Sequence, residues 1–229
     1  MMPRTLEPEV MDTPEEADGY DSMDHSLPNE NFVGRLVELG ARGSMLDIGC
    51  GPGHVALLVA ARIGDAEILG VDLAANMLRH AERRRAASPH RSRLRFEIAD
   101  AKRLPYADDS FDTVFSNTIM HHIPEPAPYL AEAFRVLRPG GVLLIRDLFR
   151  PPTPERALEL VALHAASADA YQKELFRASL HAALTPEEFA DLAHRAGIRG
   201  HRIVIDTDRH MSLQIVGTVP GTVPTISTS

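Results

Sequence analysis

A glycine-rich turn between two apolar stretches constrains the fold of this chain more than any other feature. Residues 46–54 read Leu-Asp-Ile-Gly-Cys-Gly-Pro-Gly-His, and the helical apolar pattern of residues 55–61 follows directly. Glycine tolerates backbone conformations that other residues avoid, and it lets the backbone come very close to a ligand. The pattern therefore predicts a strand, a tight turn and a helix start that together form a nucleotide-type pocket.

The glycine spacing separates two classes of nucleotide site. A dinucleotide fingerprint requires Gly-x-Gly-x-x-Gly, in which the last glycine lets the helix pack on the strand near the pyrophosphate. Here the glycines are Gly49, Gly51 and Gly53, and position 54 is histidine. The spacing argues against an NAD(P)-dependent oxidoreductase, which stays as one alternative.

Helical and strand periods alternate along the chain. Helices are predicted at residues 29–39, 54–63, 74–87 and 126–137, and strands at residues 44–48, 67–71, 93–98, 112–116 and 141–147. The sequence Thr185-Pro-Glu-Glu188 is a capping box that starts a helix to about residue 195, and the stretches 202–206 and 210–216 form a final hairpin. This alternation predicts a doubly wound α/β sheet with its ligand at the carboxyl ends of the strands.

Four further motifs follow the glycine turn in a fixed order. Asp72 ends the second apolar run, and Arg-Phe-Glu-Ile-Ala-Asp-Ala occupies residues 95–101. Residues 104–117 read Leu-Pro-Tyr-Ala-Asp-Asp-Ser-Phe-Asp-Thr-Val-Phe-Ser-Asn, and residues 135–145 place Arg-Pro-Gly-Gly before a buried strand. Across roughly residues 44–150 the five motifs together resemble the class I S-adenosylmethionine-dependent methyltransferases.

This resemblance implies a cofactor, S-adenosylmethionine, and a set of residues that bind it. The turn accommodates the methionine part, the carboxylate of Asp72 accepts hydrogen bonds from both ribose hydroxyls, and Asp100 holds the adenine amino group. The full set expected around the cofactor is Tyr20, Asp47, Gly49, Cys50, Gly51, Gly53, Asp72, Leu73, Met77, Asp100, Ala101, Asn117 and His122. Tyr20 is included because Tyr20-Asp21 resembles the "YD" that many relatives place over the cofactor.

The resemblance also implies a Rossmann-like, seven-stranded, mostly parallel sheet with an antiparallel last strand and helices on both faces. We expect one methyltransferase domain over residues 19–216, between mobile tails at residues 1–18 and 217–229. Residues 150–184 carry helical apolar spacing that the core does not account for. They form either a cap over the active site or an ordinary helix pair packed on the sheet, and the sequence does not separate the two.

His121 and His122 follow the fourth strand and lie at the expected rim of the cofactor site. Either is a candidate catalytic base, because imidazole titrates near neutral pH. The surrounding passage also occurs in methyltransferases with different acceptors, so a place in the pocket wall is the competing interpretation. Asp147, at the end of the fifth strand, opens toward the same site by topology.

The nearest family group includes the ubiquinone and menaquinone C-methyltransferases. Those enzymes carry Gly-Leu-Arg-Asn after strand four, whereas this chain has Ile-Met-His-His at 119–122, which puts quinone methylation in doubt. Nucleic-acid amino-methyltransferases need Asn/Asp-Pro-Pro-Tyr/Phe here, and Asn117-Thr-Ile-Met120 does not match. A small-molecule acceptor remains, with its N, O, S or C nucleophile open, and a non-catalytic S-adenosylmethionine-binding protein is the other alternative.

Composition agrees with this interpretation. A chain of 229 residues is long enough for one sizeable core. Its net charge of −8 disfavours a nucleic-acid groove. Its only cysteine, Cys50, excludes a disulfide framework and multi-cysteine metal sites. We expect no bound metal, no membrane segment, a cytoplasmic location and a monomer or homodimer.

Overall fold

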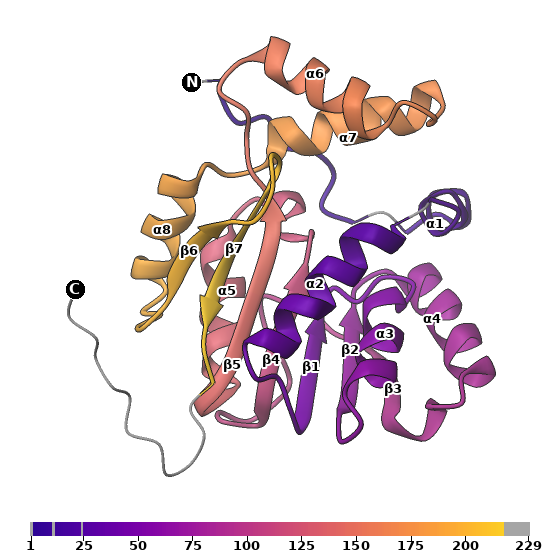
Figure 1. Cartoon of the computed structure of the whole chain (residues 1–229), viewed down its shortest axis with the longest axis vertical. Helices are drawn as coiled ribbons and strands as arrows, with labels where there is room; N and C mark the ends of the chain where they lie inside the picture. Colours follow the sequence, from indigo (N-terminus) through magenta and orange to yellow (C-terminus); the bar gives the residue numbers. More distant parts are fainter. Residues whose placement is uncertain (1, 11, 24, 218–229) are drawn as a thin grey trace.

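The computed structural model describes residues 2–10, 12–23 and 25–217 (Figure 1). The helices are α1 (Pro14–Asp21), α2 (Ser26–Glu38), α3 (His54–Arg62), α4 (Ala75–Ala87), α5 (Pro126–Arg135), α6 (Pro154–His164), α7 (Ala170–Ala182) and α8 (Pro186–Arg195), with short 3-10 turns η1 (Arg91–Arg93) and η2 (Met120–His122). The strands are β1 (Ser44–Ile48), β2 (Glu67–Asp72), β3 (Leu94–Ile98), β4 (Phe111–Asn117), β5 (Leu137–Leu148), β6 (Arg202–Ile205) and β7 (His210–Ile215).

The strands form one sheet of seven in the order β3-β2-β1-β4-β5-β7-β6. The first five are mutually parallel, β7 runs antiparallel to β5, and β6 pairs antiparallel with β7. The order reverses between β1 and β4, where a doubly wound sheet opens a crevice for ligand. The predicted Rossmann-like fold and its hairpin edge are confirmed.

Helices cover both faces of the sheet, so its central strands are buried along most of their length. Met45 and Phe115 point to a core shared with α2 and α3, whereas Leu46 and Val114 point to a core shared with α5 and α8. The alternation of strand residues between two buried faces explains why most residues of β1 and β4 are buried. It also fixes the ends of both strands, from which the functional side chains project.

Residues 2–10 cross the carboxyl end of the sheet as an extended segment, which we call the N-terminal segment (Figure 1). The Met2 amide donates to the Pro152 carbonyl and the Thr5 amide to the His181 carbonyl, both at 3.1 Å. Thr13 then caps α1 in a capping box with Glu16. The sequence predicted a mobile tail over residues 1–18, but its described part makes specific contacts with the rest of the chain.

The helix pair α6 and α7 stands beyond the carboxyl ends of the strands (Figure 1). Its apolar faces meet around Leu160, Val161 and Leu180, and they pack on Leu148 at the end of β5. The helix pair therefore packs against the end of β5 and does not cover a face of the sheet. The predicted capping box of Thr185 and Glu188 is present at the start of α8.

Within the described residues, no helix has both the length and the apolar character needed to cross a bilayer. The expected tail at residues 217–229 lies outside the described residues, apart from Gly217. The division into one domain with two tails stays a prediction.

Candidate functional site

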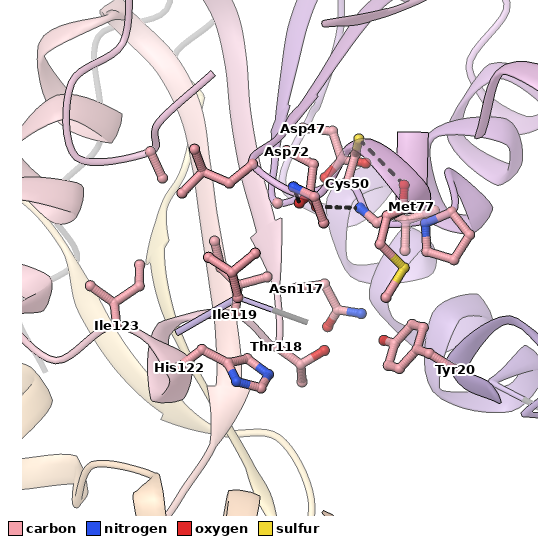
Figure 2. A pocket seen from close by; sticks show the side chains of 18 of the residues that line it. Tyr20, Asp47, Cys50, Asp72, Met77, Asn117, Thr118, Ile119, His122 and Ile123 are labelled. Atoms are coloured by element: carbon pink, nitrogen blue, oxygen red, sulfur yellow. Dashed lines mark hydrogen bonds between the residues drawn. The ribbon is translucent and has the colours of Figure 1, made fainter. Parts of the chain in front are cut away.

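A pocket opens at the carboxyl ends of β1, β2 and β4, where the strand order reverses (Figure 2). It has a polar floor at the glycine turn and a more apolar wall after β4. Its lining residues are Glu9, Val10, Tyr20, His25, Asn29, Asp47, Gly49, Cys50, Gly51, Pro52, His54, Val55, Asp72, Leu73, Ala74, Met77, Ala99, Asp100, Ala101, Lys102, Asn117, Thr118, Ile119, His122 and Ile123.

The glycine turn owes its shape to three left-handed residues. Gly49, Gly51 and Gly53 have φ angles of 70°, 51° and 81°, a region that costs an L side chain about 1–2 kcal/mol. A Cβ on Gly49 would lie 2.5 Å from a methyl carbon of Ile119, whereas one on Gly51 would meet no atom within 4 Å. Gly51 thus leaves the space at the pocket floor open for a ligand.

Two carboxylates lie beside this turn. Asp72 accepts hydrogen bonds from the Gly51 amide (2.8 Å) and the Ala74 amide (2.9 Å), so the strand end fixes its orientation. Asp47 is 2% exposed, and its Oδ2 has no hydrogen-bond partner. Burial, and then the charge of Asp72, raises the pKa of Asp47 well above its usual range. A buried, unpaired carboxylate oxygen favours a donor or a cation supplied by a ligand.

Asp100 is a third carboxylate in the pocket lining. It accepts a hydrogen bond from the Lys102 amide at 2.9 Å and forms an ion pair with Lys102 Nζ at 3.0 Å. The same Nζ is paired with Glu9 of the N-terminal segment. The basic charge of Lys102 is therefore compensated by two carboxylates, and the N-terminal segment is tied to this part of the lining.

A cluster of polar side chains around Asp21 fastens α1 beside the glycine turn. Asp21 forms an ion pair with Arg84 at 2.6 Å, and its carboxylate oxygens lie 3.1 Å from ring nitrogens of His54 and His80. Burial raises the pKa of Asp21, but the hydrogen bond and charge of Arg84 outweigh it, so the pKa lies below its usual value. His54, which departs from the dinucleotide fingerprint, thus has a defined role: it binds α1.

This cluster positions Tyr20 at the pocket. Tyr20 packs with Ala17, Ala74 and Met77, and its ring stacks on His25 at a centroid distance of 4.8 Å. Burial, followed by the charge of Asp72, raises the pKa of Tyr20 to about 12, so its hydroxyl stays a hydrogen-bond donor. Figure 2 shows the ring close to Met77 and Asn117 at the mouth of the pocket.

We expect Asp21→Asn to weaken binding of the pocket's ligand by about 5- to 30-fold, the equivalent of about 1–2 kcal/mol. The change removes the charged partner of Arg84 and loosens the helix that holds Tyr20. Isothermal titration calorimetry measures the effect. Asp18→Asn is the matched control, because Asp18 contacts His80 from a side chain that is 73% exposed. Equal losses in both variants would contradict a role for Asp21 in the pocket.

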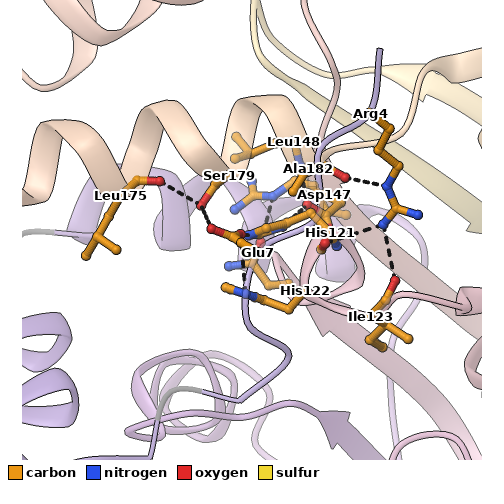
Figure 3. A network of polar contacts seen from close by, with 12 residues as sticks. Arg4, Glu7, His121, His122, Ile123, Asp147, Leu148, Leu175, Ser179 and Ala182 are labelled. Carbon is orange, nitrogen blue, oxygen red and sulfur yellow. Dashed lines mark hydrogen bonds and ion pairs between the residues drawn. The ribbon is translucent and has the colours of Figure 1, made fainter.

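The two candidate histidines differ in their surroundings (Figure 3). His121 is 4% exposed and does not line the pocket; its Nδ1 lies 2.6 Å from Asp147 Oδ1. Burial lowers the pKa of His121, but Asp147 and then Glu7 raise it above the usual value. His122 does line the pocket, and burial together with the neighbouring His121 lowers its pKa to about 3.

Asn117 belongs to a polar chain that reaches the pocket from β5. Its Oδ1 accepts a hydrogen bond from Arg146 Nε at 2.9 Å, and its Nδ2 lies 3.4 Å from Asn29 Oδ1. The next residue, Thr118, has a φ of 60°, which is unusual for a β-branched residue, and its amide donates to the Arg146 carbonyl at 2.8 Å. This backbone turn carries the chain from β4 into η2 and aims residues 119–122 at the pocket.

Every residue expected around the cofactor lines this pocket except Gly53, whereas His121, expected as a candidate base, does not line it. A Cβ on Gly53 would approach Phe96 and Ala81, so this glycine serves the packing of the helix instead. Sequence reasoning missed Glu9, Val10, Asn29 and Thr118. None of residues 150–184 lines the pocket. The N-terminal segment and α1 contribute to the lining instead, through Glu9, Val10 and Tyr20.

Comparison with known proteins agrees with this arrangement. Residues 46–145 match the family described as a methyltransferase domain. The chain is 34% identical, over 167 residues, to the 27-O-demethylrifamycin SV methyltransferase of Amycolatopsis mediterranei. The aligned region covers 69% of this chain and 60% of that protein. It is 35% identical to a demethylmenaquinone methyltransferase of Desulfitobacterium hafniense over 52% of this chain and 48% of that protein. The chain thus spans about half the length of the curated relatives it matches.

Solved structures share the fold. A methyltransferase of Methanococcus maripaludis described as S-adenosyl-L-methionine-dependent superimposes with a TM-score of 0.68 at 19% identity, covering 96% of this chain and all of that chain. Phosphoethanolamine N-methyltransferase 2 of Haemonchus contortus, solved with S-adenosyl-L-methionine, superimposes with a TM-score of 0.64 at 24% identity, over 85% of this chain and 44% of that chain.

Proposed function

We propose that this protein transfers the methyl group of S-adenosylmethionine to a small-molecule acceptor, because residues 46–145 match the family described as a methyltransferase domain. The observation that carries the proposal is the pocket floor. There an open left-handed glycine, a strand-end carboxylate with fixed orientation and a buried carboxylate oxygen without a partner converge at one end of β1 and β2.

The residues of the pocket fit this cofactor. Asp47 Oδ2 offers an unpaired acceptor beside the turn, suited to the ammonium of the methionine part. Asp72 uses two of its lone pairs on amides and keeps others for two ribose hydroxyls. We assign Asp100, which lines the same pocket, to the adenine amino group.

When bound, the cofactor supplies a methyl group on a cationic sulfur, which leaves as a neutral thioether. The chain then has to hold the acceptor in line with the carbon–sulfur bond and keep water out. Ile119, Ile123 and Val10 contribute apolar side chains to the lining, and Tyr20 lies at the mouth. Alignment and exclusion of water are therefore the main contributions that we assign to these side chains.

The charge of the lining restricts the acceptor. Glu9, Asp47, Asp72 and Asp100 are acidic, and Lys102 is the one lysine or arginine among the described lining residues. Since Lys102 is already paired with Glu9 and Asp100, a phosphorylated acceptor finds no free cation there. We therefore propose a neutral, partly apolar acceptor, in line with the methyl acceptors named for the rifamycin and menaquinone relatives.

We propose that His121 and His122 serve as wall and support residues rather than as a base. Both nitrogens of His121 face carboxylates, from Asp147 and Glu7, and His122 Nδ1 faces the Pro8 carbonyl and Glu7. We expect His122→Gln to lower kcat by less than about tenfold, because alignment supplies most of the rate. Steady-state kinetics on the true acceptor measures this, and a loss of about 10²- to 10⁴-fold would identify His122 as a base.

A screen with methyl-labelled S-adenosylmethionine tests the proposed function directly. The panel contains thiols, amines, phenols, carboxylates and carbon nucleophiles, and transfer of label to any of them supports the proposal. Cofactor binding without transfer across the panel would favour a non-catalytic binding protein, and preferential binding of NAD(P) would favour an oxidoreductase. A cytoplasmic location, the lack of a nucleic-acid partner and a monomeric or dimeric state stay predictions.

A further inference from the structure

A cluster of Glu7, His121 and His122 lies where the N-terminal segment crosses η2 (Figure 3). Glu7 Oε1 is 3.3 Å from His121 Nε2 and 3.3 Å from His122 Nδ1, and the three atoms lie within 4.8 Å of one another. We propose that these side chains bind a divalent transition-metal ion of the zinc type. The proposal goes beyond methyl transfer and differs from the expectation, drawn from the sequence, that the protein binds no metal.

The spacing of the three atoms suits zinc. Zinc binds imidazole nitrogen at about 2.0–2.1 Å and carboxylate oxygen at about 2.0–2.2 Å, so neighbouring ligands of a tetrahedral ion lie roughly 3.4 Å apart. Two of the three distances between these atoms, those from Glu7 Oε1 to the two histidine nitrogens, are close to this value. The Pro8 carbonyl oxygen lies 3.3 Å from His122 Nδ1 and is a further oxygen at the same place.

Glu7 carries an unsatisfied charge that an ion would compensate. Its side chain is 9% exposed, and Oε1 has no hydrogen-bond partner. Its other oxygen receives only a long contact of 3.5 Å from the Ser179 hydroxyl. Leaving a buried carboxylate oxygen unpaired is unfavourable. Glu7 Oε1 lies 3.3 Å from each of two imidazole nitrogens, and a cation bound to all three atoms explains this arrangement.

A second carboxylate prepares His121 as a ligand. Asp147 Oδ1 lies 2.6 Å from His121 Nδ1, and Asp147 Oδ2 accepts a hydrogen bond from the His121 amide at 3.1 Å. With the proton on Nδ1, the lone pair of Nε2 points at Glu7. Carboxylate–histidine–metal triads have this form, in which the outer carboxylate fixes the tautomer and ring orientation. Glu7 and Asp147 together also balance the charge of one divalent ion.

The competing explanation is a proton instead of a metal. A doubly protonated His121 would bridge Asp147 and Glu7 with the same two contacts. That explanation also needs a proton on His122 Nδ1, which would donate to Glu7 Oε1 or to the Pro8 carbonyl, both 3.3 Å away, whereas a single ion accounts for both contacts of Glu7. The guanidinium of Arg4 is the other nearby cation, but it donates to the carbonyls of Ala182 (2.6 Å) and Ile123 (3.2 Å) rather than to Glu7.

Titration of the metal-free, full-length protein with ZnCl₂ in a calorimeter tests the proposal without any activity assay. We expect one tight site, and we expect Glu7→Gln and His122→Gln each to weaken it by at least about 100-fold. Asp147→Asn should weaken it by about 10- to 100-fold, as is typical of an outer carboxylate. Substitution with Co²⁺ gives a second readout, because a four-coordinate site of this kind produces visible absorption that Zn²⁺ abolishes.

His164→Gln serves as the control. It removes a histidine that pairs with Asp208, outside the proposed site. This variant should bind Zn²⁺ like the parent protein. No Zn²⁺ binding by the parent, or binding that neither Glu7→Gln nor His122→Gln weakens, would overturn the proposal; the first result would leave the protonated His121 as the explanation, and the second would show adventitious binding elsewhere.

Discussion

Gly51→Val is expected to abolish binding of S-adenosylmethionine while the sheet stays folded. The native φ of 51° is one that a β-branched residue strongly disfavours. A Cβ at this position meets no protein atom within 4 Å, so the added side chain would project into the space left for the ligand. The effect is thus a steric block combined with a distorted turn. Calorimetric titration with the cofactor measures it.

Gly64→Val is the control for this substitution. Gly64 lies in the exposed turn before β2, has no positive φ, and has no neighbour within 4 Å of its added Cβ. The same chemical change there should leave cofactor affinity and thermal unfolding close to those of the parent protein. A Gly51→Val protein that still binds the cofactor with native affinity would place the ligand somewhere other than the glycine turn.

Asp72→Ala is expected to weaken cofactor binding by about 1.5–3 kcal/mol, or roughly 10- to 150-fold. The substitution removes charge-assisted hydrogen bonds to two ribose hydroxyls. It also releases the Gly51 and Ala74 amides, which Asp72 holds at 2.8 and 2.9 Å. Asp72→Asn separates the two effects, because an amide oxygen still accepts one of these hydrogen bonds but carries no charge.

Calorimetry and thermal unfolding together decide the outcome for Asp72. Asp65→Ala provides the matched control, since Asp65 is an exposed aspartate in the turn just before the same strand. Unchanged cofactor affinity in an Asp72→Ala protein with native unfolding behaviour would contradict the ribose assignment. A loss in both variants would point to a general electrostatic effect of removing negative charge.

The sequence predicted the sheet well because its signals are local. β2 and the second half of β5 are largely apolar runs next to turn residues, and Thr185 with Glu188 marked the start of α8 through hydrogen bonds within four residues. The glycine turn and Asp72 were placed for the same reason: both sit at strand ends, and the carboxyl ends of parallel strands meet at one edge of the sheet.

The N-terminal contacts could not be predicted in the same way. Glu7 meets His121 across more than a hundred residues, and Glu9 meets Lys102 across 93. The composition of this stretch is acidic and proline-containing, which is typical of a mobile tail. The basic and imidazole side chains that contact this N-terminal stretch come close to it only in the folded protein. Likewise, the pairing of Asp21 with His54, His80 and Arg84 depends on α1 docking on α4, which no local pattern encodes.

One continuous stretch, residues 2–21 apart from residue 11, touches α7 through Thr5, the rim of the pocket through Glu9 and its mouth through Tyr20. A ligand that leaves the pocket past Glu9 and Tyr20 has to displace this stretch. We therefore expect cofactor and acceptor to depart faster in any variant that detaches the stretch.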